Sequence, residues 1–280
     1  MVINLKKGKL YIVATPIGNL EDITLRALRI LKEVDIIAAE DTRQTLKLLN
    51  YYEINKPLIS YHRHNEDVKS GVLIEKLKKG DNIALVSDAG TPGICDPGEE
   101  VIRRAIEEKI QVIPIPGACA MINALICSGI STKEFEFLGF LPLNKKLRKE
   151  KLNEIKNSNK TIIIYEAPHK MKATLEDLKE ILEKRNIVLA RELTKIHEEF
   201  IRKNIDELLN EIDSLKGEMI LIIERNFKIE NEEKKLNELS LEEHYKFYEN
   251  SGLNKKEIIK KVAKDRNLTK NEIYMYFLEK

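Results

Sequence analysis

The chain has 280 residues, of which 42% are hydrophobic and 34% charged, and its net charge is +2. The apolar content suffices for one large or two medium cores, and the small net charge leaves any contact with a polyanion to local patches. Three cysteines without C-x-x-C spacing argue against a disulfide framework or a metal site. No apolar run approaches the roughly 20 residues of a membrane helix, and the first residues lack an export signal, so we expect a cytoplasmic protein.

In the first half of the chain, β-branched apolar runs alternate with segments of helical periodicity. The expected strands are 10–14, 35–39, 82–87 and 111–115, and the expected helices are 24–32, 42–49, 65–79, 98–108 and 118–128. This rhythm is typical of an α/β fold whose mostly parallel sheet is covered by helices on both faces. Ligands in such sheets bind beyond the carboxyl ends of the strands. We expect Ala124 and Leu125, late in the last helix, to pack against this sheet.

The second half predicts a different arrangement, because several strands follow one another without a helix between them. The expected strands are 135–140, 161–165, 187–190, 198–202 and 218–223, and the expected helices are 145–157, 169–184 and 205–214. Consecutive strands favour hairpins and therefore an α+β or mixed sheet. The predicted organisation is an α/β domain at 1–129, an α+β domain at 130–227, a linker at 228–243 and a helical unit at 244–280.

The helical unit resembles a helix-turn-helix. Thr269 and Glu272 form a capping box after a tight turn, which indicates two short helices. From Gly252 onward, Lys and Arg outnumber Asp and Glu, which favours contact with phosphates. A charged hairpin that only packs or aids solubility explains the pattern nearly as well.

Two loops near the start of the chain follow predicted strands and are rich in turn-forming and charged residues. In the first, at 14–24, Pro16 fixes φ and Gly18 permits positive φ, so backbone N–H groups are available to a polar ligand. An ordinary strand-to-helix turn explains it equally well. In the second, at 39–43, Asp41 suits a helix N-cap and Arg43 suits bidentate contact with a phosphate.

Two further loops are more distinctive. The loop at 86–100 carries three glycines and two prolines, far more than a connection requires. Gly90 and Gly93 allow the backbone to approach a ligand, and Asp88 supplies an acceptor for an amino group. In the loop at 114–121, Gly117 and the small residues after it leave room for a flat group such as adenine.

Together with the strings at 138–142, 165–170, 190–195 and 216–219, these four loops resemble the RsmI family, the bacterial small-subunit rRNA 2′-O-ribose cytidine methyltransferases. The resemblance runs from about Lys9 to the final helix, in the family's order and spacing. It implies a tetrapyrrole-methylase-like fold, with two α/β domains, a cleft between them and a C-terminal helical unit. It also implies a homodimer that binds S-adenosylmethionine and methylates a cytidine near the decoding centre of 16S rRNA or of the small ribosomal subunit.

The resemblance assigns cofactor contacts to matching positions of this sequence. From the first domain these are Pro16, Gly18, Asp88, Gly90, Thr91, Pro92, Ile94, Gly117, Cys119 and Ala120. From the second domain they are Tyr165, Glu166, Ala190, Glu192, Gly217 and Glu218.

Methyl transfer to a ribose hydroxyl needs positioned reactants and an acceptor for the hydroxyl proton. The candidate catalytic residues facing the expected cleft are Asp41, Arg43, Glu166 and Glu192, with His169 as a further candidate base. Each can instead belong to a structural ion pair, and the sequence does not single out a base.

RNA contacts are predicted on basic segments. His62 and His64 suit a loop on RNA phosphate better than a metal site, which needs more ligands. The basic run at 144–151 is a solvated helix face or an RNA-backbone contact. The predicted RNA-binding residues are Arg43, His62, His64, Lys145, Lys146, Arg148, Lys149, Lys170, Arg191, Lys255, Lys256 and Lys270.

Two alternatives remain open: methylation of a small tetrapyrrole of the precorrin type, and a non-catalytic RNA-binding assembly factor that keeps the fold. The basic C-terminal unit and the Ala-Glu-Asp-Thr-Arg string argue against the first. We expect no membrane and no DNA partner.

Overall fold

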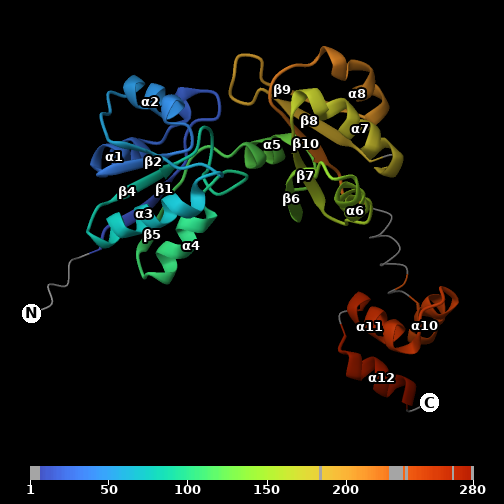
Figure 1. Ribbon diagram of the computed structural model, residues 1–280. Coiled ribbons are helices and arrows are strands. Elements are labelled where there is room, and N and C mark those ends of the chain that lie inside the picture. Colours follow the sequence, from blue (N-terminus) through green and yellow to red (C-terminus); the bar gives the residue numbers. More distant parts are fainter. Residues whose placement is uncertain (1–6, 183–184, 227–235, 237–238, 267, 279–280) are drawn as a thin grey trace, which may run out of the picture.

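The computed structural model describes residues 7–182, 185–226, 236, 239–266 and 268–278. Figure 1 shows two sheets, each with its own helices, followed by a group of three helices toward the C-terminus. No helix in these described ranges is both long and apolar enough to cross a membrane.

The first sheet is parallel throughout, with strand order β3-β2-β4-β1-β5. Its strands are β1 (Lys9–Val13), β2 (Ile36–Ala39), β3 (Leu58–Ser60), β4 (Ile83–Val86) and β5 (Gln111–Ile115). Its helices are α1 (Leu25–Glu33), α2 (Thr42–Tyr51), α3 (Glu66–Lys78) and α4 (Glu99–Glu107), with a 3-10 turn at Leu20–Asp22.

Helices cover both faces of this sheet, as the sequence predicts. Successive residues of a strand point to opposite faces, so Leu10 and Ile12 of β1 pack with α3 and α4 while Val13 packs with α1 and α2. The sequence does not predict strand β3, because three residues at a sheet edge carry too little periodicity to be recognised.

The second sheet is mixed, with order β6-β7-β10-β8-β9, and only its β6–β7 pair is parallel among the described strands. Its strands are β6 (Phe135–Phe140), β7 (Thr161–Glu166), β8 (Ile187–Arg191), β9 (Glu199–Lys203) and β10 (Met219–Ile223). One face packs against α6 (Lys145–Lys156), α7 (Pro168–Leu182), α8 (Ile205–Glu211) and the 3-10 turn Ile212–Ser214. The expected fold class is therefore confirmed.

Helix α5 (Ala120–Ser128) covers the other face of the second sheet. Ala124 and Leu125 pack with Ile163 and Val188 of that sheet, so the expectation that they pack against the first sheet is wrong. The helix precedes residue 129 in the chain, yet its apolar side chains complete the second core. Periodicity shows that a helix has an apolar face but not which sheet covers it.

The C-terminal unit has three helices instead of the expected two: α10 (Leu241–Asn250), α11 (Lys255–Asp265) and α12 (Lys270–Leu278). The expected linker lies mostly outside the described residues, and its last part, 241–243, belongs to α10. The signal that the sequence reading missed is a capping box of Ser240 and Glu243. The three helices enclose a core of their own, which includes Tyr248, Val262 and Ile273.

A buried histidine in this unit predicts that its stability depends on pH. His244 is fully buried, and its Nδ1 accepts a hydrogen bond of 3.0 Å from Arg266 Nε. Burial and then the Arg266 charge lower the pKa of His244, against the opposing charge of Asp265. In the unfolded chain this histidine has its ordinary pKa of about 6.5, so the unfolded chain binds the extra proton more readily than the folded unit does. The stability that neutral His244 contributes is therefore fully present above about pH 6.5 and is lost as the pH falls below that value.

We expect backbone amides of 241–278 in the full chain to lose hydrogen-exchange protection between pH 7.5 and 5.5, after correction for intrinsic exchange rates. His244→Gln, which cannot take up the proton, is expected to remove this pH dependence. Equal protection of the wild-type unit at both pH values would contradict the interpretation.

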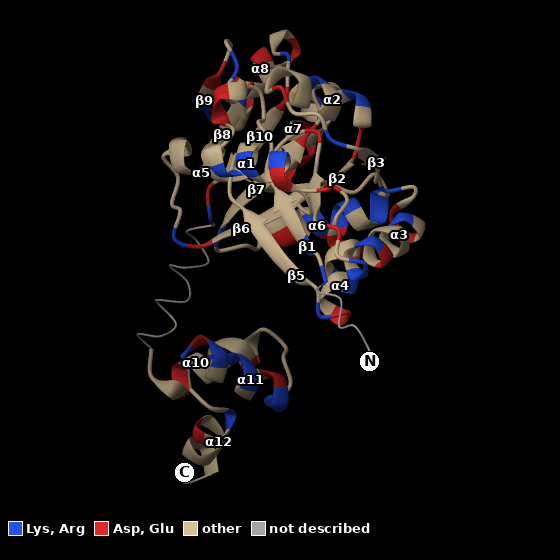
Figure 2. Ribbon diagram, turned by 90° about the vertical axis from the view of Figure 1, so that its left-hand side faces the viewer, with Lys and Arg blue, Asp and Glu red and all other residues tan. Residues whose placement is uncertain are grey.

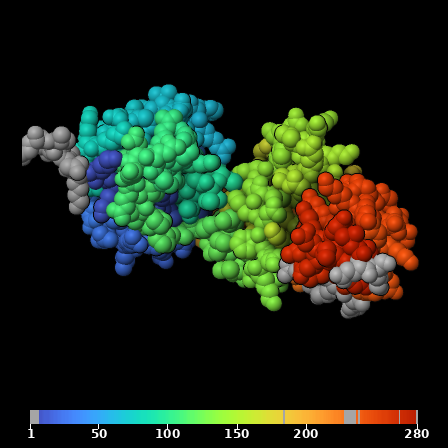
Figure 3. All heavy atoms as spheres, turned by 90° about the horizontal axis from the view of Figure 1, so that it is seen from below, coloured from blue at the N-terminus to red at the C-terminus, as the bar shows by residue number. Residues whose placement is uncertain are grey.

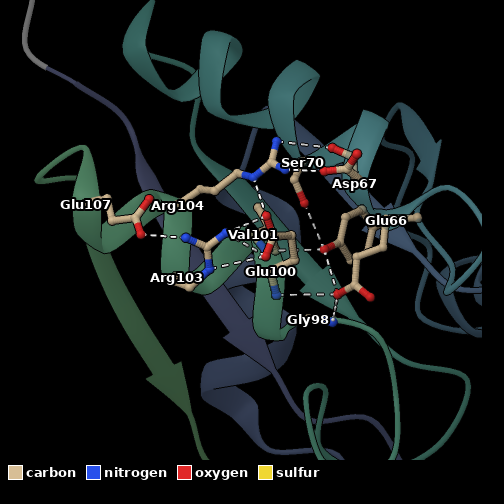
Figure 4. Close-up of polar contacts among 10 residues, drawn as sticks. Glu66, Asp67, Ser70, Gly98, Glu100, Val101, Arg103, Arg104 and Glu107 are labelled. Atoms are coloured by element: carbon tan, nitrogen blue, oxygen red, sulfur yellow. Dashed lines mark hydrogen bonds and ion pairs between the residues drawn. The ribbon is translucent and has the colours of Figure 1, made fainter.

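Figure 4 shows a polar network that fixes the start of α4 against α3. Glu66 Oε1 accepts hydrogen bonds from the Gly98 amide at 2.9 Å and from the Tyr61 hydroxyl at 3.0 Å. The same hydroxyl accepts from the Val101 amide at 3.3 Å. Arg104 pairs with Glu100 and with Asp67, which ties the two helices together. The network therefore holds the C-terminal end of the long loop between β4 and α4.

Removing the Tyr61 hydroxyl is expected to destabilise the chain. Tyr61 is fully buried, so Tyr61→Phe leaves the Val101 amide without this partner, at a cost of about 1–3 kcal/mol. Tyr51→Phe is the matched control, because Tyr51 is 64% exposed. Urea unfolding measures both; a Tyr61→Phe loss no greater than the control's would show that the hydroxyl contributes little.

Candidate functional site

A cleft of about 390 Å³ lies where loops of the first domain meet the second sheet. Figure 3 shows the two sheet domains as separate masses that meet in a narrow region. Nine of the predicted cofactor residues line the cleft: Gly90, Thr91, Ile94, Cys119, Ala120, Tyr165, Glu166, Ala190 and Glu218. Its other lining residues are Ile17, Ala89, Cys95, Asp96, Phe140, Ala167, Pro168, Leu193, Met219 and Ile220.

The first-domain wall is a set of loops joined through their backbones. The Thr15 amide donates to the Gly90 carbonyl at 2.9 Å, and the Gly90 amide returns a bond of 3.1 Å. Gly90 has a φ of +82°, which only glycine adopts at little cost. The Thr91 hydroxyl donates to the Ala118 carbonyl at 3.2 Å and so connects two loops that follow different strands. These bonds hold the loops of this wall together.

The second-domain wall is centred on Tyr165, at the end of β7. Its hydroxyl accepts a 3.0 Å hydrogen bond from the Met121 amide in the first turn of α5. Its ring packs edge-on against Phe137 and Phe140. Burial raises the pKa of the Tyr165 hydroxyl, so the phenol stays neutral at physiological pH. Tyr165 therefore joins α5 to the second sheet at the edge of the cleft.

Glu166 lines the cleft, but its carboxylate is already used within the second domain. It is 5% exposed; one oxygen accepts from the Thr174 hydroxyl at 2.7 Å and the other from the Ala167 amide at 2.9 Å. The first bond reaches Thr174 within α7 and the second reaches the residue before this helix, where Pro168 suits a first helical position.

Glu192 and Gly217 lie beside the cleft but do not line it. Glu192 Oε1 accepts from Lys195 Nζ at 3.0 Å and from the Glu218 amide at 3.0 Å. Burial opposes ionisation of Glu192, but these two donors hold its pKa below its usual value. Gly217 has a φ of +92°, and an added Cβ would lie 2.3 Å from the Glu192 carboxyl group. Glycine is thus favoured where the two strand ends meet.

Five other predicted cofactor residues also stay outside the lining: Pro16, Gly18, Asp88, Pro92 and Gly117. At both glycines the chain passes close to its neighbours. An added Cβ on Gly117 would lie 2.8 Å from the Ala14 Cβ, and one on Gly18 would lie 2.6 Å from the Lys195 Cγ. Asp88 accepts a 3.0 Å bond from the Asp41 amide, so it joins the second and third loops.

The predicted catalytic pair Asp41 and Arg43 lies on the surface outside the cleft lining. The carboxylate of Asp41 contacts Arg43 Nη2 at 2.7 Å, and the Arg43 side chain is 86% exposed. The hydrogen bonds from Arg43 hold the pKa of Asp41 at about 2. Asp41 is thus a weak base, and Arg43 remains accessible to an anionic partner.

The predicted RNA-binding residues spread over several elements. Arg148 is engaged within the second domain by Asp177 at 2.6 Å, and Arg191 is paired with Glu199 at 2.8 Å. The remaining lysines of the set lie on α6, α7, α11 and α12. Figure 2 shows Lys and Arg along α11.

The residue of greatest chemical interest that sequence reasoning missed is Asp96. It lies within the long loop at 86–100, but the sequence assigns it no role, because Glu40 and Arg63, which influence it, come from distant segments. Burial, and then the charge of Glu40, raise the pKa of Asp96 to about 6, while Arg63 opposes this shift. Burial, followed by the charge of Asp88, also raises the pKa of Glu40.

Residues 9–209 match the family of tetrapyrrole (corrin/porphyrin) methylases. The chain is 52% identical to "Ribosomal RNA small subunit methyltransferase I" of Halalkalibacterium halodurans, over 96% of this chain and 94% of that protein. It is 50% identical to the Bacillus subtilis protein of the same name, over 95% and 93% of the two chains.

Solved structures with a similar fold include the methyltransferase CobJ, with a TM-score of 0.60, 16% identity and coverage of 78% of this chain and 94% of that one. Diphthine synthase also has a TM-score of 0.60, at 13% identity, with coverage of 79% and 92%. Uroporphyrin-III C-methyltransferase from Thermus thermophilus, complexed with S-adenosyl homocysteine, has a TM-score of 0.56 at 15% identity, with coverage of 78% and 97%. The chain therefore belongs to the tetrapyrrole methylase superfamily and, within it, to the ribosomal RNA small subunit methyltransferase I family of S-adenosylmethionine-dependent methyltransferases.

Proposed function

We propose that the chain methylates the ribose 2′-hydroxyl of a cytidine in 16S rRNA, near the decoding centre of the small ribosomal subunit. The observation that carries this proposal is the extent of the match to proteins named ribosomal RNA small subunit methyltransferase I. It covers 96% of the chain and so takes in both sheets and much of the C-terminal helices. The solved structures of tetrapyrrole-type methyltransferases share the fold at only 14–19% identity, and a shared fold does not identify the substrate.

The cleft fits S-adenosylmethionine in size and in lining. Its volume is within the usual range for small-molecule sites, and its walls combine apolar side chains with a few polar groups. The small residues Ala120 and Ala190 leave room for a flat purine, while Gly90 and Thr91 bring backbone groups to the first-domain wall. The bound cofactor supplies an activated methyl group on a sulfonium. The protein's part is to hold the two reactants in line and to exclude water.

The basic residues predicted to contact RNA fit a role in positioning this substrate. Arg43 at the surface and Lys255, Lys256 and Lys270 on the C-terminal helices carry charges that suit phosphates. Such a substrate places the enzyme in the cytoplasm. The homodimer implied by the family resemblance stays a prediction, which light scattering of the purified chain tests.

The proposed function is tested with small ribosomal subunits from cells that lack this methyltransferase. Subunits are incubated with the purified chain and S-adenosylmethionine carrying a deuterated methyl group, and digested nucleosides are analysed by mass spectrometry. We expect labelled 2′-O-methylcytidine at one site of 16S rRNA. Absence of label, or label on a base, would contradict the proposal.

Two control reactions separate the alternatives. Label transferred to a precorrin-type tetrapyrrole instead of RNA would favour the tetrapyrrole function. Binding to subunits without binding of S-adenosylmethionine in calorimetry would favour a non-catalytic assembly factor.

A further inference from the structure

Transfer of a methyl group to a ribose hydroxyl requires an acceptor for the hydroxyl proton, within hydrogen-bond reach of that oxygen. Three carboxylates line the cleft among the described residues: Asp96, Glu166 and Glu218. The inference that follows rests on the proposed function and concerns which of the three takes the proton.

Two of the three carboxylates have other partners. Both oxygens of Glu166 accept hydrogen bonds, one from the Ala167 amide and one from the Thr174 hydroxyl of α7. The Glu218 side chain is 75% exposed and lies 3.1 Å from Lys195 Nζ, so water and an ammonium group compete for it. Asp96 forms no ion pair with any residue in the described part of the chain.

The loop that carries Asp96 is held in place from three sides. Cys95 has a φ of +62°, a left-handed conformation that costs a non-glycine residue energy and is often found at functional sites. The Arg63 guanidinium donates to the Cys95 carbonyl. Gly139 of β6 packs so closely that an added Cβ would lie 3.1 Å from the Cys95 Sγ, and Glu66 holds the amide of Gly98. Asp96 is therefore fixed at the edge where both domains meet.

The charges around Asp96 suit a proton acceptor. Burial raises its pKa to about 6; the charges of Glu40 and Asp88 add to the shift, while Arg63 and the Ser87 hydroxyl oppose it. The neighbouring Tyr165 and Cys95 have raised pKa values and stay neutral at physiological pH. The electrostatic interaction of His62 with Glu40 lowers the pKa of the Glu40 carboxyl group and so opposes the effect of burial there. At pH 7 to 8 Asp96 is thus mainly ionised, yet it is a stronger base than an ordinary aspartate.

We propose that the Asp96 carboxylate accepts the ribose 2′-hydroxyl proton during methyl transfer, and that Glu40 tunes it without touching the reacting atoms. In this step the ribose O2′ forms a bond to the methyl carbon as the bond from that carbon to sulfur breaks. The hydroxyl proton moves to Asp96, and the sulfonium leaves as the neutral thioether of S-adenosylhomocysteine. The carboxyl group then returns its proton to water.

Substitution of the acid tests the role directly. Asp96→Asn is expected to lower the single-turnover rate on small subunits by about 100-fold to 10,000-fold, with affinity for S-adenosylhomocysteine within about threefold of wild type. Glu107→Gln is the matched control, because Glu107 on α4 forms an exposed pair with Arg103. The control is expected to react at the wild-type rate.

The pH profile provides a readout that a merely structural role would not move. The wild-type single-turnover rate should fall as the pH drops through about 6. Glu40→Gln removes a negative neighbour and should shift this limb to lower pH, whereas Arg63→Gln should shift it to higher pH. The two opposite shifts test the proposal even if Asp96→Asn does not fold.

The outcomes distinguish this inference from the proposed function. A wild-type chain that labels no RNA contradicts the function itself. The role of Asp96 alone is overturned if the wild-type chain labels RNA but Asp96→Asn reacts at the wild-type rate. The same holds if neither Glu40→Gln nor Arg63→Gln shifts the fall in rate at acidic pH.

Discussion

Replacing Ala120 with phenylalanine is expected to weaken binding of S-adenosylhomocysteine by about 100-fold or more, equivalent to about 2.8 kcal/mol, while the chain stays folded. Ala120 is the first residue of α5, and it lines the cleft. A phenyl ring there occupies space that the nucleoside needs, and the neighbouring Tyr165 is held by its bond to Met121 and cannot withdraw freely. Isothermal titration calorimetry measures the affinity, and circular dichroism checks the fold.

The matched control is Ile126→Phe on the same helix. Ile126 is 62% exposed and lies outside the cleft lining, so its replacement should leave the affinity unchanged. If Ala120→Phe binds the ligand as tightly as the control does, the nucleoside does not occupy this part of the cleft.

Replacing Gly217 with alanine is expected to reduce the free energy of unfolding by about 2–3 kcal/mol. About 1–2 kcal/mol comes from the left-handed backbone conformation, and about 1 kcal/mol from hydrogen bonds lost when the Glu192 carboxylate moves aside. The new Cβ would lie 2.3 Å from that carboxyl group, which Lys195 and the Glu218 amide hold in place. Urea unfolding measures the loss.

Gly129→Ala separates the two contributions. Gly129 has a φ of +82°, similar to that of Gly217, but nothing lies within 4 Å of an added Cβ. Its replacement should therefore cost only the conformational part, about 1–2 kcal/mol. Equal losses in the two variants would show that Glu192 moves without cost and that its bonds contribute little to the second domain.

Much of the fold follows from local sequence patterns. The β-branched runs and helical periodicity predict the parallel first sheet, the mixed second sheet and nearly all of their elements. Patterns fail where the outcome depends on distant partners. The sequence does not show that Ala124 and Leu125 pack on the second sheet, or that three residues at 58–60 pair with β2.

The candidate site divides in the same way. Glycine- and proline-rich loops after strands predict where the cleft is, because the carboxyl ends of neighbouring parallel strands meet at one edge. They do not show which loop residues face the cleft. Gly18 and Gly117 serve close packing between segments, while Asp96, in a loop that the sequence does single out, gains its unusual environment from Glu40 and Arg63. Neither effect is visible in spacing alone.

A crystal structure of the chain with S-adenosylhomocysteine tests the central claim most directly. We predict the nucleoside between the wall formed by Gly90, Thr91 and Ala120 and the wall formed by Tyr165 and Ala190. A ligand bound anywhere else, with this cleft left empty at saturating concentration, would contradict that prediction.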